Sequence, residues 1–395
     1  MRTISPKSEY RQLQILFFVF AIFIMAWVPR FPEVKANLGL SNGQFGTLIS
    51  TGTLGALASL FFSGHIVHKF GTKKVILTNT VLITLVFIFI VQTNSPGLFL
   101  VLNVALGWGI SGYHIASNAQ AFHSMERVKD LTISRLHGIW ALGALCTAII
   151  SGLVVDHISL ALHVGGLTFA MALIVFASIY KLSPVLMKAN EEKEEHLPVR
   201  TLITSFRVDW LISGGLVCAV FLEFATGDWS AIFAKERIGV SSGMAALPYV
   251  VFMTAMIIGR LNAGSIAKRF QVDQTVRLFA LIGGGGFLTF LTITVHIPAE
   301  HKTLAFVTTC IAFTFAGMGS SLMAPSFYTA GNQRSPLPSA VVVGQIGVVN
   351  MIAVFILKAS IAWTAQFTGS LAIALTIPAL MLMSTAFFAR ALKAS

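Results

Sequence analysis

The sequence feature that most constrains the fold is a series of apolar segments, each long enough to cross a lipid bilayer. A helix needs about 20 mostly apolar residues to span the hydrocarbon core, and that core holds no water to satisfy the backbone of an open strand. We therefore predict an all-α polytopic membrane protein with twelve transmembrane helices. The expected helices cover residues 13–31, 43–67, 75–91, 98–121, 136–155, 161–180, 211–233, 244–267, 276–295, 304–327, 340–359 and 369–389.

Composition agrees with a membrane protein. Of the 395 residues, 55% are hydrophobic and 11% are charged, whereas soluble domains carry about 25% charged residues. The cysteines Cys146, Cys218 and Cys310 lie far apart in apolar segments, which predicts neither a disulfide framework nor a metal site. The sequence contains no phosphate-binding loop and no nucleophile elbow. We therefore expect no cofactor, no ATP-driven step and no enzyme activity.

A polar stretch, residues 181–210, divides the chain near its middle. It contains the run EEKEEH, and we interpret it as a cytoplasmic linker between two six-helix bundles, residues 1–180 and 211–395. The two halves repeat: Gly39, Ser41, Gly43, Gly64 and Phe70 recur as Gly239, Ser241, Gly243, Gly264 and Phe270. A second repeat relates LGWGIS at 106–111 to AGMGSS at 316–321. Parallel repeats predict pseudo-symmetric halves with a substrate site between them near the midplane.

The distribution of positive charge predicts the orientation, because cytoplasmic loops of membrane proteins carry an excess of Lys and Arg. With the N-terminus inside, most of the 27 Lys and Arg residues fall in cytoplasmic segments. The outer ends and loops then hold Arg30, Lys35, Lys235, Arg237, Lys302 and Lys358. We interpret the net charge of +12 as a sign of topology rather than of a nucleic-acid partner. Both termini are expected in the cytoplasm, and the protein in the inner or plasma membrane.

Two carboxylates interrupt the seventh apolar segment. Glu223 lies near its middle, and Asp228 follows five residues later. A charged side chain at membrane depth costs about 2.5–3.5 kcal/mol on the insertion scale, so such a residue is expected to serve as a proton site, an ion-pair partner or a ligand contact. A structural bond to a neighbouring helix is the alternative. A carboxyl group in a low-dielectric site can exchange a proton near neutral pH, which makes Glu223 the first candidate for proton coupling.

The loop after the second apolar segment has a distinctive pattern. It reads GHIVHKFGTKK over residues 64–74 and resembles the signature loop of the major facilitator superfamily. The residues that match the pattern are Gly64, Lys69, Gly71, Lys73 and Lys74, whereas His68 takes the place of its acidic residue. The resemblance implies that this loop helps to hold the inward gate closed. With His68 in place of the acidic residue, its contribution to the closed gate would be weak or would depend on pH. A tight turn that only anchors the topology is the alternative.

Three further motifs resemble the YbjJ-like branch of that superfamily: NAQA at 118–121, LHGIWALGAL at 136–145 and GDWSAIF at 227–233. An acidic residue usually stands four positions before the NAQA asparagine in that branch, where this chain has His114. The histidine at this position implies either that the protein couples transport to an ion in a different way or that His114 carries the proton. His114 and Asn118 share one helix face because they are four residues apart. Hydrogen bonding across helices is the structural alternative.

The resemblance also implies that the first, fourth, seventh and tenth helices line the cavity. The expected proton-coupling residues are Glu223, Asp228 and His114, and the expected substrate-binding residues are Trp27, Asn118, Trp229, Ser321, Tyr328, Gln345 and Asn350. Arg260 is expected to brace the cytoplasmic gate or to form a salt bridge with Glu223. Aromatic faces, amides and a carboxylate suit a small polar or amphipathic organic solute.

We therefore expect a monomeric secondary transporter that moves a small molecule across the bilayer by alternating access, coupled to protons or another ion. A sugar-like or other polar metabolite is favoured as the substrate. Export of a drug or metabolite by proton antiport is the alternative, although residues 136–155 lack the Gly-Pro motif that drug antiporters of the superfamily usually carry. The short cytoplasmic segments argue against a non-transporting receptor, and the scattered polar residues argue against a membrane enzyme.

Overall fold

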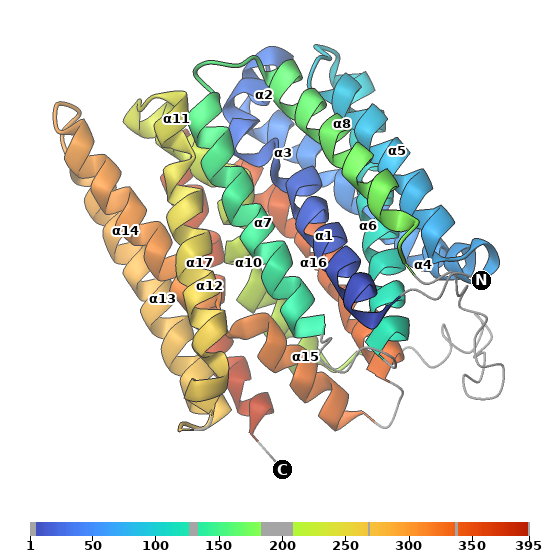
Figure 1. Ribbon diagram of the computed structural model, residues 1–395. Helices are drawn as coiled ribbons and strands as arrows, with labels where there is room; N and C mark the ends of the chain where they lie inside the picture. The colour runs from blue at the N-terminus through green and yellow to red at the C-terminus, as the bar shows by residue number, and fades with distance from the viewer. Residues whose placement is uncertain (1–4, 126–132, 183–207, 268, 336–338, 394–395) are drawn as a thin grey trace. The chain divides into compact units, whose positions relative to one another are not determined.

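The computed structural model describes residues 5–125, 133–182, 208–267, 269–335 and 339–393. Every regular element within these ranges is a helix (Figure 1), and twelve of the described segments are long and apolar enough to cross a membrane. The prediction of an all-α membrane protein with twelve transmembrane helices is therefore confirmed. The predicted linker, residues 181–210, falls mostly outside the described residues.

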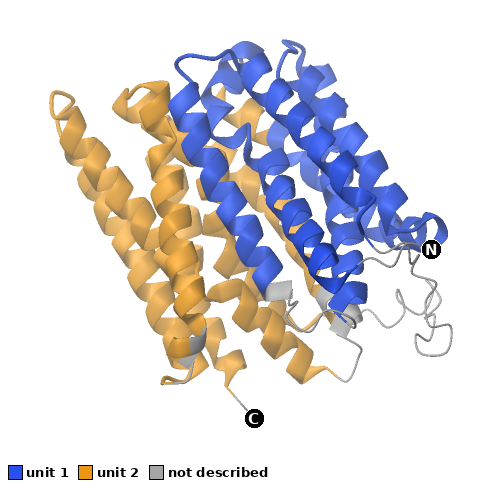
Figure 2. Cartoon of the chain, in the orientation of Figure 1, with its two compact units in different colours: residues 1–39, 48–196 blue, residues 40–47, 197–395 orange. Residues whose placement is uncertain are grey.

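The chain divides into two compact units (Figure 2). Unit 1 comprises residues 1–39 and 48–196, and unit 2 comprises residues 40–47 and 197–395. The helices of unit 1 are α1 (Pro6–Met25), α2 (Phe31–Leu38), α4 (Gly52–Phe70), α5 (Thr72–Ile90), α6 (Pro96–Met125), α7 (Ile133–Val154) and α8 (Leu160–Ile179). Those of unit 2 are α10 (Trp210–Phe233), α11 (Ser242–Ala245), α12 (Leu247–Ala267), α13 (Val272–His296), α14 (Lys302–Ser320), α15 (Met323–Arg334), α16 (Ser339–Thr368) and α17 (Leu371–Phe388). The short helix α3 (Asn42–Ser50) begins in unit 2 and ends in unit 1.

Both units show the same pattern of helix neighbours. In unit 1, α6 packs against α4 and α5, and α1 packs against α7 and α8. In unit 2, α14 packs against α12 and α13, which Figure 1 shows side by side with it, and α10 packs against α16 and α17. The segments that repeat in the sequence, α4 with α12 and α6 with α14, therefore occupy equivalent places in their units.

The first sequence repeat encodes a turn that precedes the second helix of each half. Gly39 ends α2 with a φ of 61°, and Gly239 ends the π-helical turn Ala234–Ile238 with a φ of 74°. This left-handed conformation favours glycine, which has no Cβ to clash. Two residues later, the hydroxyl of Ser41 accepts a hydrogen bond from Gln44 N at 3.4 Å, and that of Ser241 accepts one from Met244 N at 3.3 Å. Each serine thus caps the helix that follows.

The second sequence repeat supplies glycines where two helices touch. A methyl group on Gly107 of α6 would overlap the carbonyl oxygen of Gly52 in α4. In the other unit, a methyl group on Gly317 of α14 would overlap the carbonyl oxygen of Phe252 in α12. Small residues allow this close backbone approach in membrane helices, where packing rather than the hydrophobic effect holds the helices together.

The glycine contact in unit 2 makes a stability prediction. We expect Gly317→Ala to lower the thermal midpoint of the purified protein, because overpacking a tight contact costs about 1–3 kcal/mol. Gly285→Ala in the adjacent helix α13 is the matched control, since no atom lies within 4 Å of the position that its Cβ would occupy. The control should leave the thermal midpoint unchanged or raise it slightly, because alanine has a higher helix propensity than glycine. Equal midpoints for the two variants would contradict the close contact.

One predicted helix is too short, and its correction matters for function. The eleventh helix was expected to end at residue 359, but α16 continues to Thr368. Lys358, which the charge distribution placed at the outer end, therefore lies ten residues inside the helix, or about 15 Å at 1.5 Å per residue. The tenth span also differs from expectation, because α14 ends at Ser320 and α15 begins at Met323 within one span, Lys302–Arg334.

Candidate functional site

The helices α10 and α12 bring together the first pair of predicted site residues. Arg260 Nη2 lies 3.3 Å from Glu223 Oε2, so the salt bridge considered for these two side chains is present. The side chains keep exposed fractions of 31% for Arg260 and 30% for Glu223. The described protein thus covers this pair only in part, and both residues lie in membrane-spanning helices.

A second ion pair lies on α10 and α16. Lys358 Nζ is 2.8 Å from Asp228 Oδ2, and the exposed fractions are only 15% and 11%. The ammonium group also lies 5.6 Å from the ring centroid of Phe224, within the range of a cation–π interaction. Lys358 was not among the residues predicted to have a functional role. Lys358 is a single lysine inside a long apolar run. Because the predicted helix ended at residue 359, this lysine was assigned to the outer end of the helix rather than to its interior.

Tyr249 lies close to both ion pairs. Its side chain is buried at the start of α12, and the phenol is within electrostatic reach of Glu223, Asp228 and Arg260. We call these five residues the charged cluster: Glu223, Asp228, Tyr249, Arg260 and Lys358. Its two carboxylates and two cations cancel in formal charge, which reduces the cost of placing them in the membrane. No sequence pattern marked Tyr249, because a lone tyrosine in an apolar segment is usually a packing residue.

Besides Arg260 Nε in the cluster itself, three buried polar atoms on α10 and on two helices that pack against it lack hydrogen-bond partners among the described residues. They are Ser230 Oγ on α10, Ser320 Oγ on α14 and Asn350 Oδ1 on α16. Both α14 and α16 pack against α10. Buried polar atoms are nearly always paired, so these atoms are candidates to bind a water, an ion or a ligand. Among them, Asn350 was a predicted substrate-binding residue.

The other predicted binding residues of unit 2 lie in different surroundings. Trp229 is 1% exposed, because Phe45 and Gly46 of the α3 segment cover it. Ser321 is buried, and its hydroxyl donates to Met318 O at 2.7 Å at the end of α14. Tyr328 on α15 and Gln345 on α16 are half-buried. Of these four, only the last two are accessible in this structure.

In unit 1, Trp27 lies in an aromatic core rather than at an accessible surface. Its ring contacts Phe31, Phe87 and Phe99, with centroids 5.0, 5.4 and 6.2 Å away. His114 on α6 is exposed, and Asn118, one turn later, donates from Nδ2 to His114 O at 2.9 Å. The ring of His114 also meets that of His137 on α7, with centroids 5.8 Å apart. The prediction that His114 and Asn118 share one helix face is thus consistent with their contact.

The predicted gating loop is a tight turn between α4 and α5. Gly71 has a φ of 84°, a conformation that favours glycine, and it ends α4. His68 and Lys69 are exposed, and no atom lies within 4 Å of a Cβ built on Gly64. Lys73 Nζ donates to Leu182 O at 2.6 Å, which ties the start of α5 to the residues after α8. Arg260, the remaining gating candidate, pairs with Glu223 as described above.

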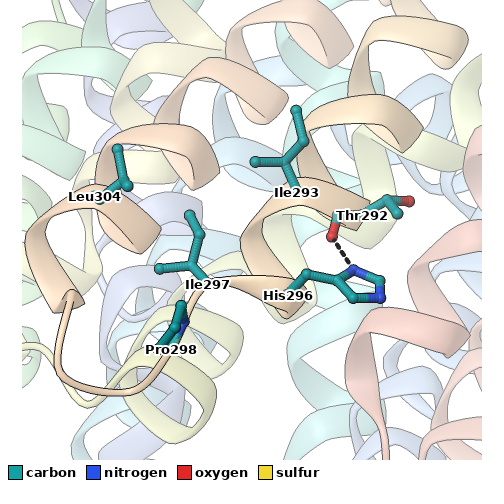
Figure 3. A pocket seen from close by; sticks show the side chains of 6 residues that line it. All are labelled: Thr292, Ile293, His296, Ile297, Pro298 and Leu304. Carbon is teal, nitrogen blue, oxygen red and sulfur yellow. Dashed lines mark hydrogen bonds between the residues drawn. The ribbon is translucent and has the colours of Figure 1, made fainter.

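A surface hollow on α13 and α14 is not part of this site (Figure 3). It has a volume of about 420 Å³ and is lined by Thr292, Ile293, His296, Ile297, Pro298 and Leu304. His296 donates a hydrogen bond from Nδ1 to Thr292 O at 2.8 Å. Its walls are mostly apolar and include no residue of the charged cluster. Within the described ranges, no group of three or more His, Cys, Asp or Glu side chains could hold a metal ion.

Comparisons with known proteins agree with this architecture. The family model described as Major Facilitator Superfamily matches residues 13–357. An uncharacterized MFS-type transporter from Yersinia pestis is 27% identical over 390 residues, which cover 97% of this chain and 96% of the relative. Among solved structures, a variant of the nucleoside transporter NupG has a TM-score of 0.76 at 13% identity and covers 98% of this chain and 100% of that one. A D-xylose–proton symporter has a TM-score of 0.72 at 14% identity, with coverages of 97% and 96%.

Proposed function

Because the chain belongs to the Major Facilitator Superfamily, a family of transporters rather than enzymes, we propose that it is a secondary active transporter that couples a small organic solute to protons. The observation that carries this proposal is the charged cluster of unit 2. Two carboxylates at membrane depth are held by cations on two other helices. Ionisable residues inside the membrane typically mark ion or substrate pathways.

Glu223 is the proposed proton-coupling residue. Its carboxylate is the more exposed of the two acids, and its bond to Arg260 Nη2 is 3.3 Å long. Protonation would remove the negative charge that holds Arg260, and this would free the guanidinium to adopt another arrangement. Asp228 is the more tightly held acid, at 2.8 Å from Lys358. We propose that it takes a secondary part in coupling, and that His114 provides a separate proton site in unit 1.

The solute is proposed to be a polar metabolite of sugar or nucleoside size. Asn118, Tyr328, Gln345 and Asn350 supply hydrogen-bonding groups on α6, α15 and α16. The two similar solved structures belong to transporters named for nucleosides and D-xylose, which supports this choice by likeness of fold alone. The motifs at 118–121, 136–145 and 227–233 support a place in the YbjJ-like branch. Trp229 and Ser321 would join the site if their cover moves during the transport cycle.

We further propose that both termini lie in the cytoplasm, with unit 1 and unit 2 as the two moving halves and a monomer as the working form. The new position of Lys358 inside α16 removes one positive charge from the outer loops, so the excess on the proposed cytoplasmic side grows. In this orientation the turn at Gly64, His68, Lys69, Gly71 and Lys73 lies at the inner face, where it would contribute to the gate.

A transport assay on the reconstituted protein tests this proposal. The full chain is placed in liposomes that contain a pH-sensitive dye, and pools of sugars, nucleosides, amino acids and organic acids are added outside. We expect at least one pool to change the internal pH and to exchange with a labelled member of the same pool. Exchange without a pH change would overturn proton coupling but leave transport standing. A protein that moves no solute from any pool would contradict the proposed function.

A further inference from the structure

Two histidines of unit 1 meet inside membrane-spanning helices. The imidazole rings of His114 on α6 and His137 on α7 have centroids 5.8 Å apart and planes at 82°. Both side chains are exposed although both helices span the membrane. A polar, ionisable ring facing lipid is costly, and ionisable side chains of membrane-spanning segments almost always face the bundle interior or a water-filled cavity. The pair is therefore a candidate contact for a solute.

Buried aromatic side chains of α1 hold both imidazoles in place. Phe20 stacks on His114 with a centroid distance of 5.7 Å and an interplanar angle of 13°, and Phe17 meets His137 edge-on at 5.7 Å and 84°. Both phenylalanines are fully or almost fully buried. Phe20 in turn stacks on the buried ring of Tyr113 at 4.6 Å and 7°. His114 is thus the exposed end of a series of nearly parallel rings, and its orientation is set before any ligand binds.

Polar groups lie next to these flat surfaces. Asn118 uses its Nδ2 for His114 O, and its Oδ1 has no hydrogen-bond partner among the described residues, so it can accept a bond from a ligand. Trp140 lies three residues after His137, on the same face of α7, and is half-buried. The surface therefore combines flat aromatic faces with the amide oxygen of Asn118 and the imidazole nitrogens of His114.

We propose that His114 and His137 form a binding surface for a planar nitrogen heterocycle, which is part of the transported solute. A flat ring can stack on an imidazole while its edge nitrogens bond to Asn118 or to the imidazole of His114. A saturated sugar offers no flat face of this kind, and a purely apolar ring would leave the polar edges unpaired. This inference rests on the proposed function, because it names the class of solute that the transporter carries.

Binding to the full-length reconstituted protein tests this proposal. The probes are a pyridine carboxamide, a purine base, a pyrimidine base and the ribosides of the two bases, with D-xylose as the non-aromatic comparison. We expect at least one heterocycle to bind and to shift the imidazole NMR signals of histidine-labelled protein. His114→Ala and His137→Ala should each weaken that binding by about tenfold, the value of one stacking contact together with one hydrogen bond.

Two further variants separate binding from folding. His114→Phe keeps a flat ring but removes both nitrogens, so we expect it to retain part of the affinity that His114→Ala loses. His157→Ala, in the exposed turn after α7, should bind like the wild type. The proposal is wrong if no heterocycle binds, or if both alanine variants bind as tightly as the wild type. Transport of sugars without heterocycle binding would overturn this inference and leave the proposed function intact. Heterocycle binding that depends on both histidines, without transport of any solute, would overturn the proposed function and with it the claim that the heterocycle is part of a transported solute, and only the binding surface would remain.

Discussion

Replacing Glu223 with Gln is expected to abolish proton-driven accumulation of the solute while leaving solute exchange. Glutamine resembles the protonated carboxyl group, so the variant would hold one state of the proposed coupling site permanently. One proton moving through 100 mV provides about 2.3 kcal/mol, which supports about 50-fold accumulation. We therefore expect the wild type to approach such a ratio in liposomes with an imposed gradient, and Glu223→Gln to equilibrate without accumulation.

The control for this experiment is Glu300→Gln, which removes an exposed carboxylate in the turn between α13 and α14. It should accumulate solute like the wild type. Loss of stability is not expected to confuse the result, because the amide oxygen of glutamine can still accept the hydrogen bond that Arg260 Nη2 donates to Glu223 Oε2 in the wild type. Unchanged accumulation by Glu223→Gln would remove this residue from the coupling mechanism.

The second large effect is expected at the more buried ion pair. Lys358→Met leaves Asp228 without its cation, and Asp228→Asn leaves Lys358 without its anion. Breaking a buried pair on one side costs about 3–5 kcal/mol, because the remaining charge is buried and uncompensated. We expect each single variant to show a large fall in thermal midpoint and in the yield of folded protein after purification.

The double variant Asp228→Asn/Lys358→Met distinguishes a charge effect from a packing effect. Because it leaves no uncompensated charge, we expect it to recover most of the stability that either single variant loses, as replaced buried pairs often do. Lys302→Met, at the exposed start of α14, is the matched control and should be neutral. A double variant as unstable as the sum of the two single variants would mean that the two side chains do not interact.

Much of the fold follows from the sequence for reasons visible in individual residues. The spans could be predicted because length and apolarity are local properties. The turns at Gly39 and Gly239 could be predicted from the repeat, because a left-handed residue after a helix and a capping serine two positions later leave a clear pattern. The end of α16 could not be predicted, because residues 359–368 mix apolar and polar side chains. Whether the helix continues through such a segment depends on its packing against other helices.

The candidate site was predictable only in part. A carboxylate in an apolar segment is conspicuous by itself, so Glu223 and Asp228 were identified. The cations that pair with these carboxylates are not conspicuous in the sequence. The ion pair between α10 and α16 joins residues 130 positions apart (228 and 358), and no local pattern indicates that contact. The same holds for Tyr249 and for the pairing of His137 with His114. Trp27, a predicted binding residue, lies in an aromatic core, and the sequence alone does not distinguish this place from a binding surface for a tryptophan near a helix end.

The balance of charges in the cluster has an electrical consequence. With both acids ionised, the charges of Glu223, Asp228, Arg260 and Lys358 sum to zero, so the membrane voltage does no net work on the cluster as a whole. When one acid takes up a proton, the cluster gains a single positive charge, and crossing 100 mV is then worth about 2.3 kcal/mol. A neutral solute carried with that proton would therefore generate a current, and the voltage would act on the loaded carrier but not on the empty one.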